Sequence, residues 1–467
     1  MQKAELAGAF QSLQDDLGKA AVLVGDDVPD RNGNDHGKLR PCPPQAVIRP
    51  VDARQLSEAV SFCRRWGLKF VAQGGLTGLC GGARPEPGWV AISLDRMTGV
   101  EEVDVQNGTM TVKAGTPLEV VQNAAEEAGL LFPLDLGARG SCTIGGNIAT
   151  NAGGNRVIRY GMTRDLVLGL EVVLADGTIV SSLNNLIKNN SGYDLKQLFI
   201  GSEGTLGIIT RAVLRLHPRP RHTDVAICAV ENYAQVQWLL SAAKAELGAQ
   251  LTAFEVMWRD YWEAVTPSLG GRPPIEGAYG FYVLIENQVT QQGADGRMFQ
   301  GWLEAALETG HFGDAAISQS EQHVRNFWAV RDAVSEFGRI LGDYISYDVG
   351  LPVEHMDAFA ARCRGELAAA MPDARSLHYG HIGDGNLHVV AWAPGIRSEA
   401  AKDVVDQVIY GAVRELGGSI SAEHGIGSTR KKWLSYSRSS PEIELMKLLK
   451  NAMDPGGFLN PGKVIPG

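Results

Sequence analysis

The sequence predicts an α+β protein with two domains and a short C-terminal segment. Its 467 residues are more than one hydrophobic core usually organises. The first ~215 residues mix strands and helices, and glycine gathers in three clusters at 74–82, 137–154 and 201–207. After a proline- and arginine-rich joint at 216–222, strands alternate with helices, which favours one antiparallel sheet with helices on a face.

Periodicity and turn signals give the elements of the first part. Alternating apolar residues predict strands, and apolar residues three and four apart predict helices. An Asp-Gly pair between two apolar runs predicts a hairpin over 165–180. Before this hairpin we expect an amphipathic helix within 1–20, strands at 46–52, 68–73, 89–97 and 108–115, and helices at 54–66 and 117–130.

The same signals place the elements that follow the joint. Strands are expected at 224–230, 277–288 and 343–352, with a strand pair around 377–392. Helices are expected at 233–247, 324–341, 354–371 and 441–453.

Composition and charge exclude several classes of function. The formal net charge is −10, which is a poor match for nucleic acid or for an anionic membrane. No run of 18 apolar residues is present, so we expect no membrane span. The N-terminus lacks the apolar core of a signal peptide, so the expected location is the cytoplasm. There the six well-separated cysteines would be reduced.

The glycine clusters have the character of ligand-binding loops. The first, GGLTGLCGG (74–82), follows a strand, and consecutive backbone N–H groups in such a loop suit a pyrophosphate. It is neither a Rossmann fingerprint nor a Walker loop, and by itself it is equally compatible with a plain turn. The second cluster lies in a long polar stretch, 133–155, of the kind that usually serves a function. The third adds glycines at 201–207 beside an apolar strand.

Four segments in order carry a resemblance to a known family: GGLTGLCGG (74–82), GSCTIGGNIATNAGG (140–154), GYDLKQLFIGSEGTLGIIT (192–210) and LNPGKV (459–464). Together they closely resemble the FAD-linked oxidases of the vanillyl-alcohol-oxidase type, with the FAD-binding domain of the p-cresol methylhydroxylase (PCMH) type. The nearest branch looks like the D-lactate, glycolate and D-2-hydroxyglutarate dehydrogenases. The resemblance implies a two-subdomain FAD-binding domain at 1–218, a substrate-binding cap domain at 219–420, and a C-terminal segment at 421–467 that carries a catalytic loop and returns to the FAD domain.

The resemblance also implies where FAD would bind. The loop 74–82 would cradle the pyrophosphate, and the later loops would line the isoalloxazine and adenine. The implied contacts are Gly74, Gly75, Leu76, Thr77, Gly78, Leu79, Gly81, Gly82, Pro133, Leu136, Gly137, Gly140, Ser141, Thr143, Gly145, Gly146, Asn147, Thr150, Asn151, Gly153, Gly154, Glu203, Gly204, Gly207, Ile208 and Asn460. Some relatives attach FAD through His or Cys. Because no histidine lies between His36 and His217, and Cys80 and Cys142 lie inside the loops, we expect non-covalent FAD.

Histidines and a glutamate near the C-terminal end suggest a metal site. His381 and His388 flank a GDGN turn, and they can converge on one point if the turn joins two strands. Glu423 and His424 are adjacent in SAEHGIG (421–427), so one can bind a metal while the other faces substrate. The alternative is a set of hydrogen-bonded turn residues, because the spacing matches no standard zinc motif.

The resemblance assigns roles to these residues. His381, His388 and Glu423 would bind a divalent ion, Zn²⁺ in the first place and Mn²⁺ as the alternative, and His424 would be the general base and contact the substrate. His378 has no role implied and is expected to support the metal ligands from behind.

The resemblance places the arginine that binds the substrate carboxylate at Arg331. On a continuous helix Arg331, Ser335 and Arg339 would share a face and line one wall of the pocket. Relatives that act on D-2-hydroxyglutarate usually have a threonine, a lysine and an asparagine at the positions of Ser335, Ser346 and Val390.

Losing the lysine and the asparagine removes partners for a distal carboxylate, whose burial unpaired costs several kcal/mol. A monocarboxylate such as D-lactate, or one with an apolar side chain, is therefore expected, with Val390 lining the pocket. Because Arg339 offers a cation for a second carboxylate, D-2-hydroxyglutarate stays the alternative substrate.

The expected partners are a small 2-hydroxy acid and an electron acceptor, which in relatives is an electron-transfer flavoprotein, a quinone or a cytochrome. A homodimer is left open. Two competing interpretations are an oxidase that passes electrons to O₂ and a non-catalytic FAD-binding subunit of a larger complex. The sequence leaves undecided which D-2-hydroxy acid, which acceptor and which metal are used.

Overall fold

The computed structural model describes residues 3–37, 39–270, 272–293 and 296–466, so residues 1 and 2 of the expected N-terminal helix lie outside the described residues. The chain divides into two compact units. Unit 1 comprises Met1–Gly153, Met162–Pro218 and Glu423–Gly467, and unit 2 comprises Gly154–Gly161 and Arg219–Ala422. Residues 154–161 were expected in the FAD-binding domain, but they fold with unit 2, and the chain returns to unit 1 at Glu423 rather than at residue 421.

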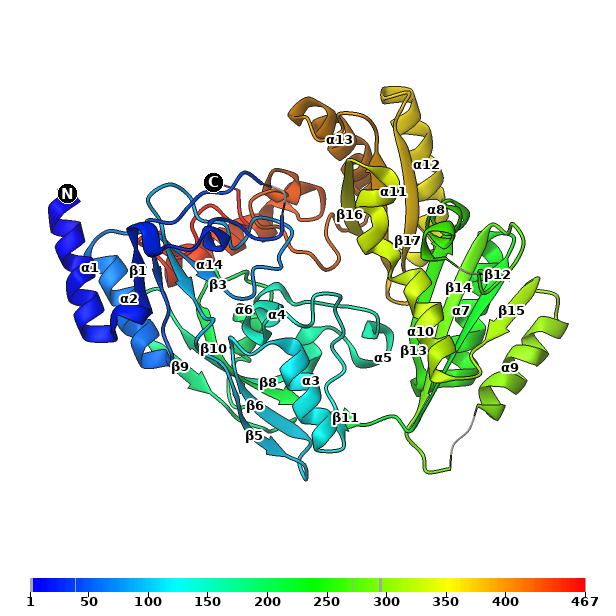
Figure 1. Ribbon diagram of the computed structural model, residues 1–467, viewed down its shortest axis with the longest axis horizontal. Coiled ribbons are helices and arrows are strands. Elements are labelled where there is room, and N and C mark those ends of the chain that lie inside the picture. The colour runs from blue at the N-terminus through cyan, green and yellow to red at the C-terminus, as the bar shows by residue number, and fades with distance from the viewer. Residues whose placement is uncertain (1–2, 38, 271, 294–295, 467) are drawn as a thin grey trace. The chain divides into compact units, whose positions relative to one another are not determined.

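Unit 1 begins with helix α1 (Lys3–Leu17) and a four-stranded sheet. The strand order is β1 (Val22–Val24), β2 (Ala46–Ile48), β4 (Val90–Ser93) and β3 (Phe70–Gln73). Helix α2 (Ala53–Arg65) follows β2, and it starts where it does because the Asp52 side chain accepts a hydrogen bond from the Gln55 N–H at 2.8 Å. The C-terminal end of the chain joins this sheet, since the Phe70 N–H donates to the Phe458 carbonyl at 2.9 Å (Figure 1).

A second sheet of unit 1 is antiparallel and has five strands. Its order is β5 (Val100–Asp104), β6 (Thr109–Lys113), β10 (Ile208–Arg215), β8 (Val167–Val173) and β9 (Ile179–Ser182), and a separate pair joins β11 (His217–Pro218) to β7 (Leu130–Leu131). The predicted hairpin is confirmed by β8 and β9, whereas β5 was not predicted. The remaining α-helices of the unit are α3 (Leu118–Glu127), α4 (Ile144–Thr150), α6 (Lys196–Phe199) and α14 (Ser440–Met453).

Unit 2 is built on one seven-stranded sheet whose neighbouring strands all run antiparallel. Its order is β15 (Asp314–Ile317), β12 (His222–Val230), β14 (Phe281–Val289), β13 (Leu251–Trp258), β17 (Arg375–His381), β18 (Asn386–Trp392) and β16 (Tyr344–Gly350). Besides the short helix α5 (Val157–Tyr160), its helices are α7 (Tyr233–Leu247), α8 (Arg259–Leu269), α9 (Arg297–Glu308), α10 (Glu321–Arg331), α11 (Phe337–Leu341), α12 (Met356–Ala370) and α13 (Glu399–Glu415).

Helices cover both faces of this sheet, so the expectation of one covered face was wrong (Figure 1). Side chains alternate between the faces along a strand. On β13, Met257 belongs to the core cluster that includes Tyr261 of α8 and Phe327 of α10. Its neighbour Trp258 points the other way, where its indole N–H donates to Asp357 of α12 at 3.0 Å. We call the α8 and α10 side face A.

The predicted helix over 324–341 is broken into α10, a 3₁₀ turn at Ala333–Glu336, and α11. The buried hydroxyl of Tyr261 explains the break, because it shares its one proton between the carbonyls of Val330 at 2.9 Å and Arg331 at 2.7 Å. These carbonyls are therefore satisfied without a continuing helix. The interruption comes from a tertiary contact that periodicity does not register.

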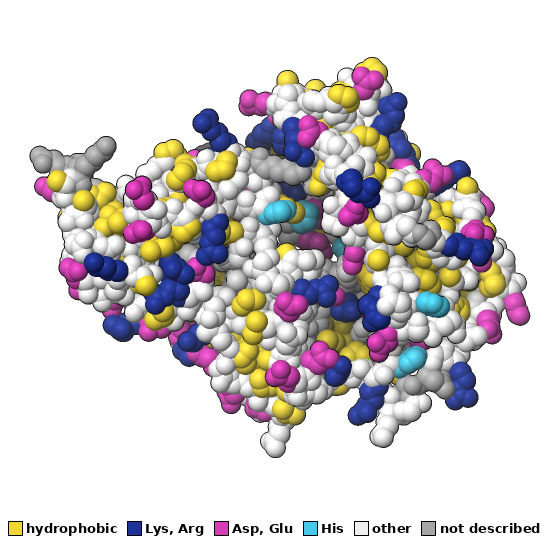
Figure 2. Space-filling model, viewed as in Figure 1, with side chains coloured by type: hydrophobic (Ala, Val, Ile, Leu, Met, Phe, Trp, Pro, Cys, Tyr) yellow, Lys and Arg dark blue, Asp and Glu magenta, His cyan; other side chains and the backbone are white. Residues whose placement is uncertain are grey.

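In the described part of the chain, no helix is both long enough and apolar enough to cross a membrane. Figure 2 shows Lys and Arg side chains interspersed with Asp and Glu side chains over the visible face. The net charge of −10 is thus not gathered into one patch on that face.

Candidate active site

The glycine loops of unit 1 pack against one another. A Cβ on Gly74 would lie 2.5 Å from the Thr143 hydroxyl oxygen, and one on Gly75 would overlap the Ser141 carbonyl. Only glycine permits this approach between the loop after β3 and the loop before α4. The first two predicted motifs therefore form one continuous surface.

The backbone is strained in the same place. All five non-glycine residues with positive φ in the described chain lie in the predicted FAD motifs: Leu76 (60°), Asn151 (49°), Glu203 (51°), Asn460 (44°) and Val464 (63°). Such conformations cost free energy and cluster at ligand-binding sites.

The loops also hold buried polar atoms that lack a partner among the described residues. These are the Thr143 and Ser202 hydroxyls and the Asn460 side-chain oxygen. Buried polar atoms are normally satisfied, so unpaired ones in a glycine-lined cradle fit a polar ligand such as a dinucleotide. The residues present therefore fit FAD.

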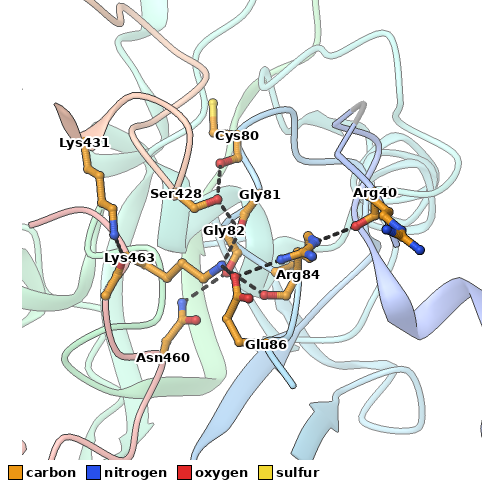
Figure 3. Close-up of polar contacts among 12 residues, drawn as sticks. Arg40, Cys80, Gly81, Gly82, Arg84, Glu86, Ser428, Lys431, Asn460 and Lys463 are labelled. Carbon is orange, nitrogen blue, oxygen red and sulfur yellow. Dashed lines mark hydrogen bonds and ion pairs between the residues drawn. The ribbon is translucent and has the colours of Figure 1, made fainter. Parts of the chain in front are cut away.

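The C-terminal tail fastens the first glycine loop (Figure 3). Lys463 is 3% exposed, and its ammonium group donates to the carbonyls of Gly81 at 2.8 Å and Arg84 at 3.0 Å. The Asn460 amide donates to the carbonyls of Gly82 at 3.2 Å and Glu203 at 2.9 Å. The tail thus fixes the loop by binding its carbonyls, which leaves backbone N–H groups for a ligand.

The predicted catalytic loop lies against these glycine loops within unit 1. A Cβ on Gly153 would lie 2.5 Å from a carboxylate oxygen of Glu423, and the Cys80 thiol donates to the His424 carbonyl at 3.3 Å. The carboxylate of Glu203 accepts from the N–H groups of Ile426 at 2.7 Å and Gly427 at 2.9 Å. Burial raises the pKa of Glu203, and these N–H groups oppose the rise. Glu203 therefore positions the catalytic loop, a task that sequence reasoning did not give it.

The two cysteines considered for covalent flavin attachment are buried free thiols. Burial raises the pKa of Cys142, which disfavours its nucleophilic thiolate form. The Cys80 sulfur faces backbone carbonyls of the catalytic loop.

In unit 2, the GDGN turn does join two strands, β17 and β18. His381 and His388 both point to face A, with ring centroids 5.2 Å apart, and they are 5% and 8% exposed. Their imidazoles are therefore close enough to share one ion, as the sequence predicted from the turn.

Arg331 reaches face A from the end of α10 and is 4% exposed. Its Nε donates to Glu255 at 2.7 Å, and its guanidinium lies 4.9 Å from the ring centroid of Tyr379. Glu255 also lies 2.7 Å from His381 Nδ1. Burial by itself would raise the pKa of Glu255, but His381 and Arg331 overcome this and lower it to about 2. The structure therefore joins the predicted substrate arginine to a predicted metal ligand through one ionised carboxylate.

The predicted pocket wall beyond Arg331 does not form. Because α10 ends at Arg331, Ser335 lies exposed in the 3₁₀ turn, and Arg339 is paired with Glu336 at 2.8 Å with its side chain 62% exposed. Val390 faces the side of Arg331 but is 1% exposed within the core cluster of face A. The expected contacts from Ser335, Arg339 and Val390 are thus not supported.

His378 was expected to support the metal ligands, and this was wrong. It is three residues from His381 on the same strand, so it points to the opposite face of the sheet. There its Nδ1 lies 3.0 Å from Arg364 and 3.5 Å from Asp260. Burial lowers the pKa of His378.

Sequence reasoning missed Glu255, Tyr379 and Lys463. Glu255 had a signal, because it is the single charged residue in the apolar strand LTAFEVMW (251–258). Tyr379 had a weaker one, since it shares a strand face with His381.

Comparison with known proteins agrees with this geometry. Residues 219–464 match the family described as FAD linked oxidases, C-terminal domain, and residues 44–182 match the family described as FAD binding domain. A D-2-hydroxyglutarate dehydrogenase of Xanthomonas citri pv. viticola is 40% identical over 427 residues, which cover 90% of this chain and 89% of that protein. The mitochondrial D-2-hydroxyglutarate dehydrogenase of Bos taurus is 38% identical over 423 residues, which cover 90% and 77%.

The fold also matches a solved structure. That of p-cresol methylhydroxylase superposes with a TM-score of 0.78 at 15% identity, covering 100% of this chain and 98% of that one. This likeness confirms the predicted PCMH-type fold, and the family matches confirm FAD as the cofactor. The chain belongs to the family of FAD linked oxidases.

Proposed function

We propose that this chain uses FAD to oxidise a D-2-hydroxy acid to the 2-oxo acid. The observation that carries the proposal is the group of His381, His388 and Arg331 on one buried sheet face, where Arg331 suits a carboxylate and the histidines suit a metal ion. The family supports the cofactor, and both relatives described above are named for a D-2-hydroxy acid.

FAD would be held by the glycine loops of unit 1, without a covalent bond, because the nearby thiols are buried and face the protein. When bound, it supplies an acceptor for the hydride that leaves the substrate Cα. The chain passes between the units at Gly153/Gly154 and at Ala422/Glu423, which lie within the second glycine motif and beside the catalytic loop. The chain therefore connects the motifs of unit 1 directly to unit 2 at these two points.

The metal ligands would be His381, His388 and Glu423, holding Zn²⁺ or, alternatively, Mn²⁺. Chain connection supports the third ligand. The Ser421 hydroxyl donates to Asp348 at 3.2 Å, and Asp348 is the direct strand partner of His388. Glu423 follows two residues later, so its Cα is within about 7 Å of the Ser421 Cα. A divalent ion at this point supplies a Lewis acid that lowers the pKa of a hydroxyl group.

His424 would accept the proton of the substrate hydroxyl on an imidazole nitrogen. Arg331 would bind the substrate carboxylate. Its Nε is already used by Glu255, so the substrate carboxylate would contact the Nη groups, of which Nη2 also lies 3.3 Å from His381 Nε2.

The proposed substrate is a monocarboxylate such as D-lactate. In relatives that act on D-2-hydroxyglutarate, an asparagine and a lysine stand at the positions of Val390 and Ser346, which pair across β18 and β16, so this chain lacks those partners for a second carboxylate. Arg339, the cation considered for that task, is paired with Glu336. D-2-hydroxyglutarate is the second candidate, favoured by the names of relatives at 38% and 40% identity.

Partners and location are further parts of the proposal. The electron acceptor would be an electron-transfer flavoprotein, a quinone or a cytochrome, with O₂ as the competing case, and a homodimer stays open. The cytoplasm remains the predicted location, although the Bos taurus relative is named as mitochondrial.

Anaerobic bleaching of the flavin against a panel of D- and L-2-hydroxy acids, with and without chelator, tests the proposal. We expect rapid bleaching by D-lactate, slower bleaching by D-2-hydroxyglutarate, none by L-acids, and loss after chelation that Zn²⁺ or Mn²⁺ restores. Bleaching by no acid would instead support a non-catalytic subunit. Rapid reoxidation by air with release of peroxide would identify an oxidase.

A further inference from the structure

A segment near the N-terminus contacts the first glycine loop at both its base and its tip. We call residues 32–37 the strap. The match to the FAD binding domain family begins only at residue 44, and no residue of the strap is among the predicted FAD contacts. The strap therefore has no assigned role, although the residues that it uses to reach the loop, Asn32 and Gly37, are buried.

A pair of buried side-chain amides joins the strap to the base of the loop. Gln73, the last residue of β3, directly precedes the loop and is 0% exposed, and Asn32 is 2% exposed. The Asn32 side-chain amide donates to the Gln73 side-chain oxygen at 2.7 Å, and the Gln73 amide donates to the Asn32 backbone carbonyl at 2.9 Å. The Gln73 amide also donates to the Ala83 carbonyl at 2.9 Å. Gln73 therefore closes the loop, because it ties the residue before Gly74 to the residue after Gly82.

A backbone contact joins the strap to the tip of the loop. The Gly37 N–H donates to the Gly78 carbonyl at 2.9 Å. A Cβ on Gly37 would lie 2.8 Å from an Asp35 carboxylate oxygen and 3.0 Å from the Leu79 carbonyl oxygen, so only glycine permits this approach. The C=O and N–H of a trans peptide point in opposite directions, so holding the Gly78 carbonyl turns the N–H of Leu79 away from the strap.

These contacts favour one arrangement of a loop that is otherwise easily deformed. Five of the nine residues in GGLTGLCGG (74–82) are glycine, whose backbone has access to many conformations. Buried polar groups that lose their partners are costly, so the strap and Gln73 oppose the alternatives. A cofactor that fits only one conformation binds more weakly in proportion to the fraction of apoprotein that adopts it.

We propose that the strap is a positioning element of the FAD site, which holds the first glycine loop, through Gln73 and Gly78, in the conformation that binds the cofactor. The inference rests on the part of the proposed function that assigns this loop to FAD. It adds an N-terminal segment to the tail residues Asn460 and Lys463, which hold other carbonyls of the loop.

Gln73→Met in the full-length protein removes the amide and keeps a side chain of similar length. Gln14→Met is the matched control, because the Gln14 amide likewise donates to a backbone carbonyl of unit 1, that of Val22 at 2.8 Å, which lies on β1 and not in a glycine loop. Gly37→Ala is a second variant, which displaces the strap from the tip of the loop and leaves the Gln73 amide in place.

The main measurement is the dissociation constant for FAD, by titration of each apoprotein followed by flavin fluorescence, once far-UV circular dichroism shows that the apoprotein is folded. Gln73→Met should raise this constant about 10-fold, which corresponds to a loop that adopts its binding conformation in about a tenth of the apoprotein. Gly37→Ala should raise it by a smaller factor, and Gln14→Met should leave it unchanged. Folded Gln73→Met and Gly37→Ala apoproteins that bind FAD like the unchanged chain would overturn the proposal. If Gln73→Met does not fold, Gly37→Ala decides.

Hydrogen–deuterium exchange of the backbone amides of residues 74–84 in the apoprotein is a second readout, which does not depend on FAD. Exchange should be faster in Gln73→Met than in Gln14→Met, because the loop opens more often without its clasp. Faster exchange with unchanged FAD affinity would also overturn the proposal, since the strap would then order a loop that does not limit cofactor binding.

Lys463→Met separates failure of this proposal from failure of the FAD assignment. Weaker FAD binding in Lys463→Met, with unchanged binding in Gln73→Met and Gly37→Ala, would refute the role of the strap alone. Unchanged binding in all three variants would refute the assignment of the first glycine loop to FAD as well.

Discussion

At the scale of single residues, the neighbours Glu423 and His424 would serve different steps of the proposed reaction. Glu423 lies against Gly153 of the second glycine loop, and the His424 carbonyl accepts from Cys80 of the first loop. The loop that carries this pair is also held by the Glu203 carboxylate, which accepts from the backbone N–H groups of Ile426 and Gly427. Removing the His424 imidazole leaves these backbone contacts in place, so it should affect the reaction more than the fold.

His424→Ala should slow anaerobic flavin reduction by about 10²- to 10⁴-fold, the usual contribution of a general base, while FAD content stays unchanged. Stopped-flow absorbance at the flavin band measures the rate, and the spectrum of the purified protein gives the FAD content. His323→Ala, an exposed histidine on α10, is the control and should reduce at the normal rate. Normal reduction in His424→Ala would remove the base assignment.

The sequence predicted which residues gather on face A more reliably than it predicted the contacts that those residues make. His381, His388 and Arg331 lie together on face A, because a short turn between two strands and a buried arginine leave few alternatives. Ser335 and Arg339 do not join them, since their placement assumed a continuous helix. Glu255 could not be assigned from sequence, because its two partners lie 76 and 126 residues away along the chain.

At the scale of elements, the end of α10 positions Arg331, the proposed substrate arginine. The Tyr261 hydroxyl binds the carbonyls of Val330 and Arg331, and thereby stops the helix at the residue that the site needs. Buried hydroxyl contacts of this kind contribute about 0.5–1.5 kcal/mol each.

Tyr261→Phe should lower the free energy of unfolding of unit 2 by about 1 kcal/mol and raise KM for D-lactate more than it changes kcat, because the Arg331 backbone loses its fixed position. Chemical denaturation followed by tryptophan fluorescence, together with steady-state kinetics, measures both. Tyr233→Phe removes a buried hydroxyl that donates to the Val353 carbonyl at 2.7 Å, and it should cost stability without changing KM. An equal change in KM for the two variants would contradict the role of Tyr261.

The pairing of β8 with β10 makes a prediction about pH. Burial opposes ionisation of Glu171, but the hydrogen bonds from Arg211 and Thr210 prevail and lower its pKa below 4.5. A carboxyl whose pKa is lower in the folded state stabilises the fold above its unfolded pKa, and the stabilisation is lost as pH falls. Glu171→Gln should therefore destabilise unit 1 by about 1 kcal/mol at pH 7.

This difference should shrink as the pH falls below 4.5, because the unfolded chain then takes up a proton that the folded chain does not, until the pH also falls through the lower pKa of folded Glu171. Thermal unfolding midpoints of both proteins at pH 7, 5 and 4 measure it. A gap in midpoint that does not narrow between pH 7 and pH 4 would contradict the ionised pairing of Glu171 with Arg211.

Most elements were predictable because their apolar periodicity is strong. Helix α7 (Tyr233–Leu247) coincides with its predicted range, and the predicted strands at 343–352 and 377–392 appear as β16 and the β17–β18 pair. Strand β5 (Val100–Asp104) was missed because its side chains are half-buried or exposed, so it carries little apolar signal. The sequence did not predict that helices cover both faces of the sheet, because periodicity does not say which face a helix covers.

At the scale of the whole molecule, the chain leaves unit 1 at residue 218 and returns to it at residue 423. Figure 1 shows the red C-terminal segment beside the blue strands of the N-terminal part. Its last residues complete the FAD cradle through Asn460 and Lys463. The proposed FAD cradle therefore combines loops of the N-terminal part with residues of the C-terminal tail.

Lys463→Met should weaken FAD binding about 10- to 100-fold. Hydrogen bonds from a charged group contribute about 1.5–3 kcal/mol, and without the ammonium group the Gly81 and Arg84 carbonyls lose their donor, so the first glycine loop loosens. Titration of apoprotein with FAD, followed by flavin fluorescence, measures the affinity. Lys431→Met is the matched control, because Lys431 donates to the Gly462 carbonyl of the tail at 2.7 Å (Figure 3). Equal FAD affinities in the two variants would show that the tail folds against the loop without helping it to bind the cofactor.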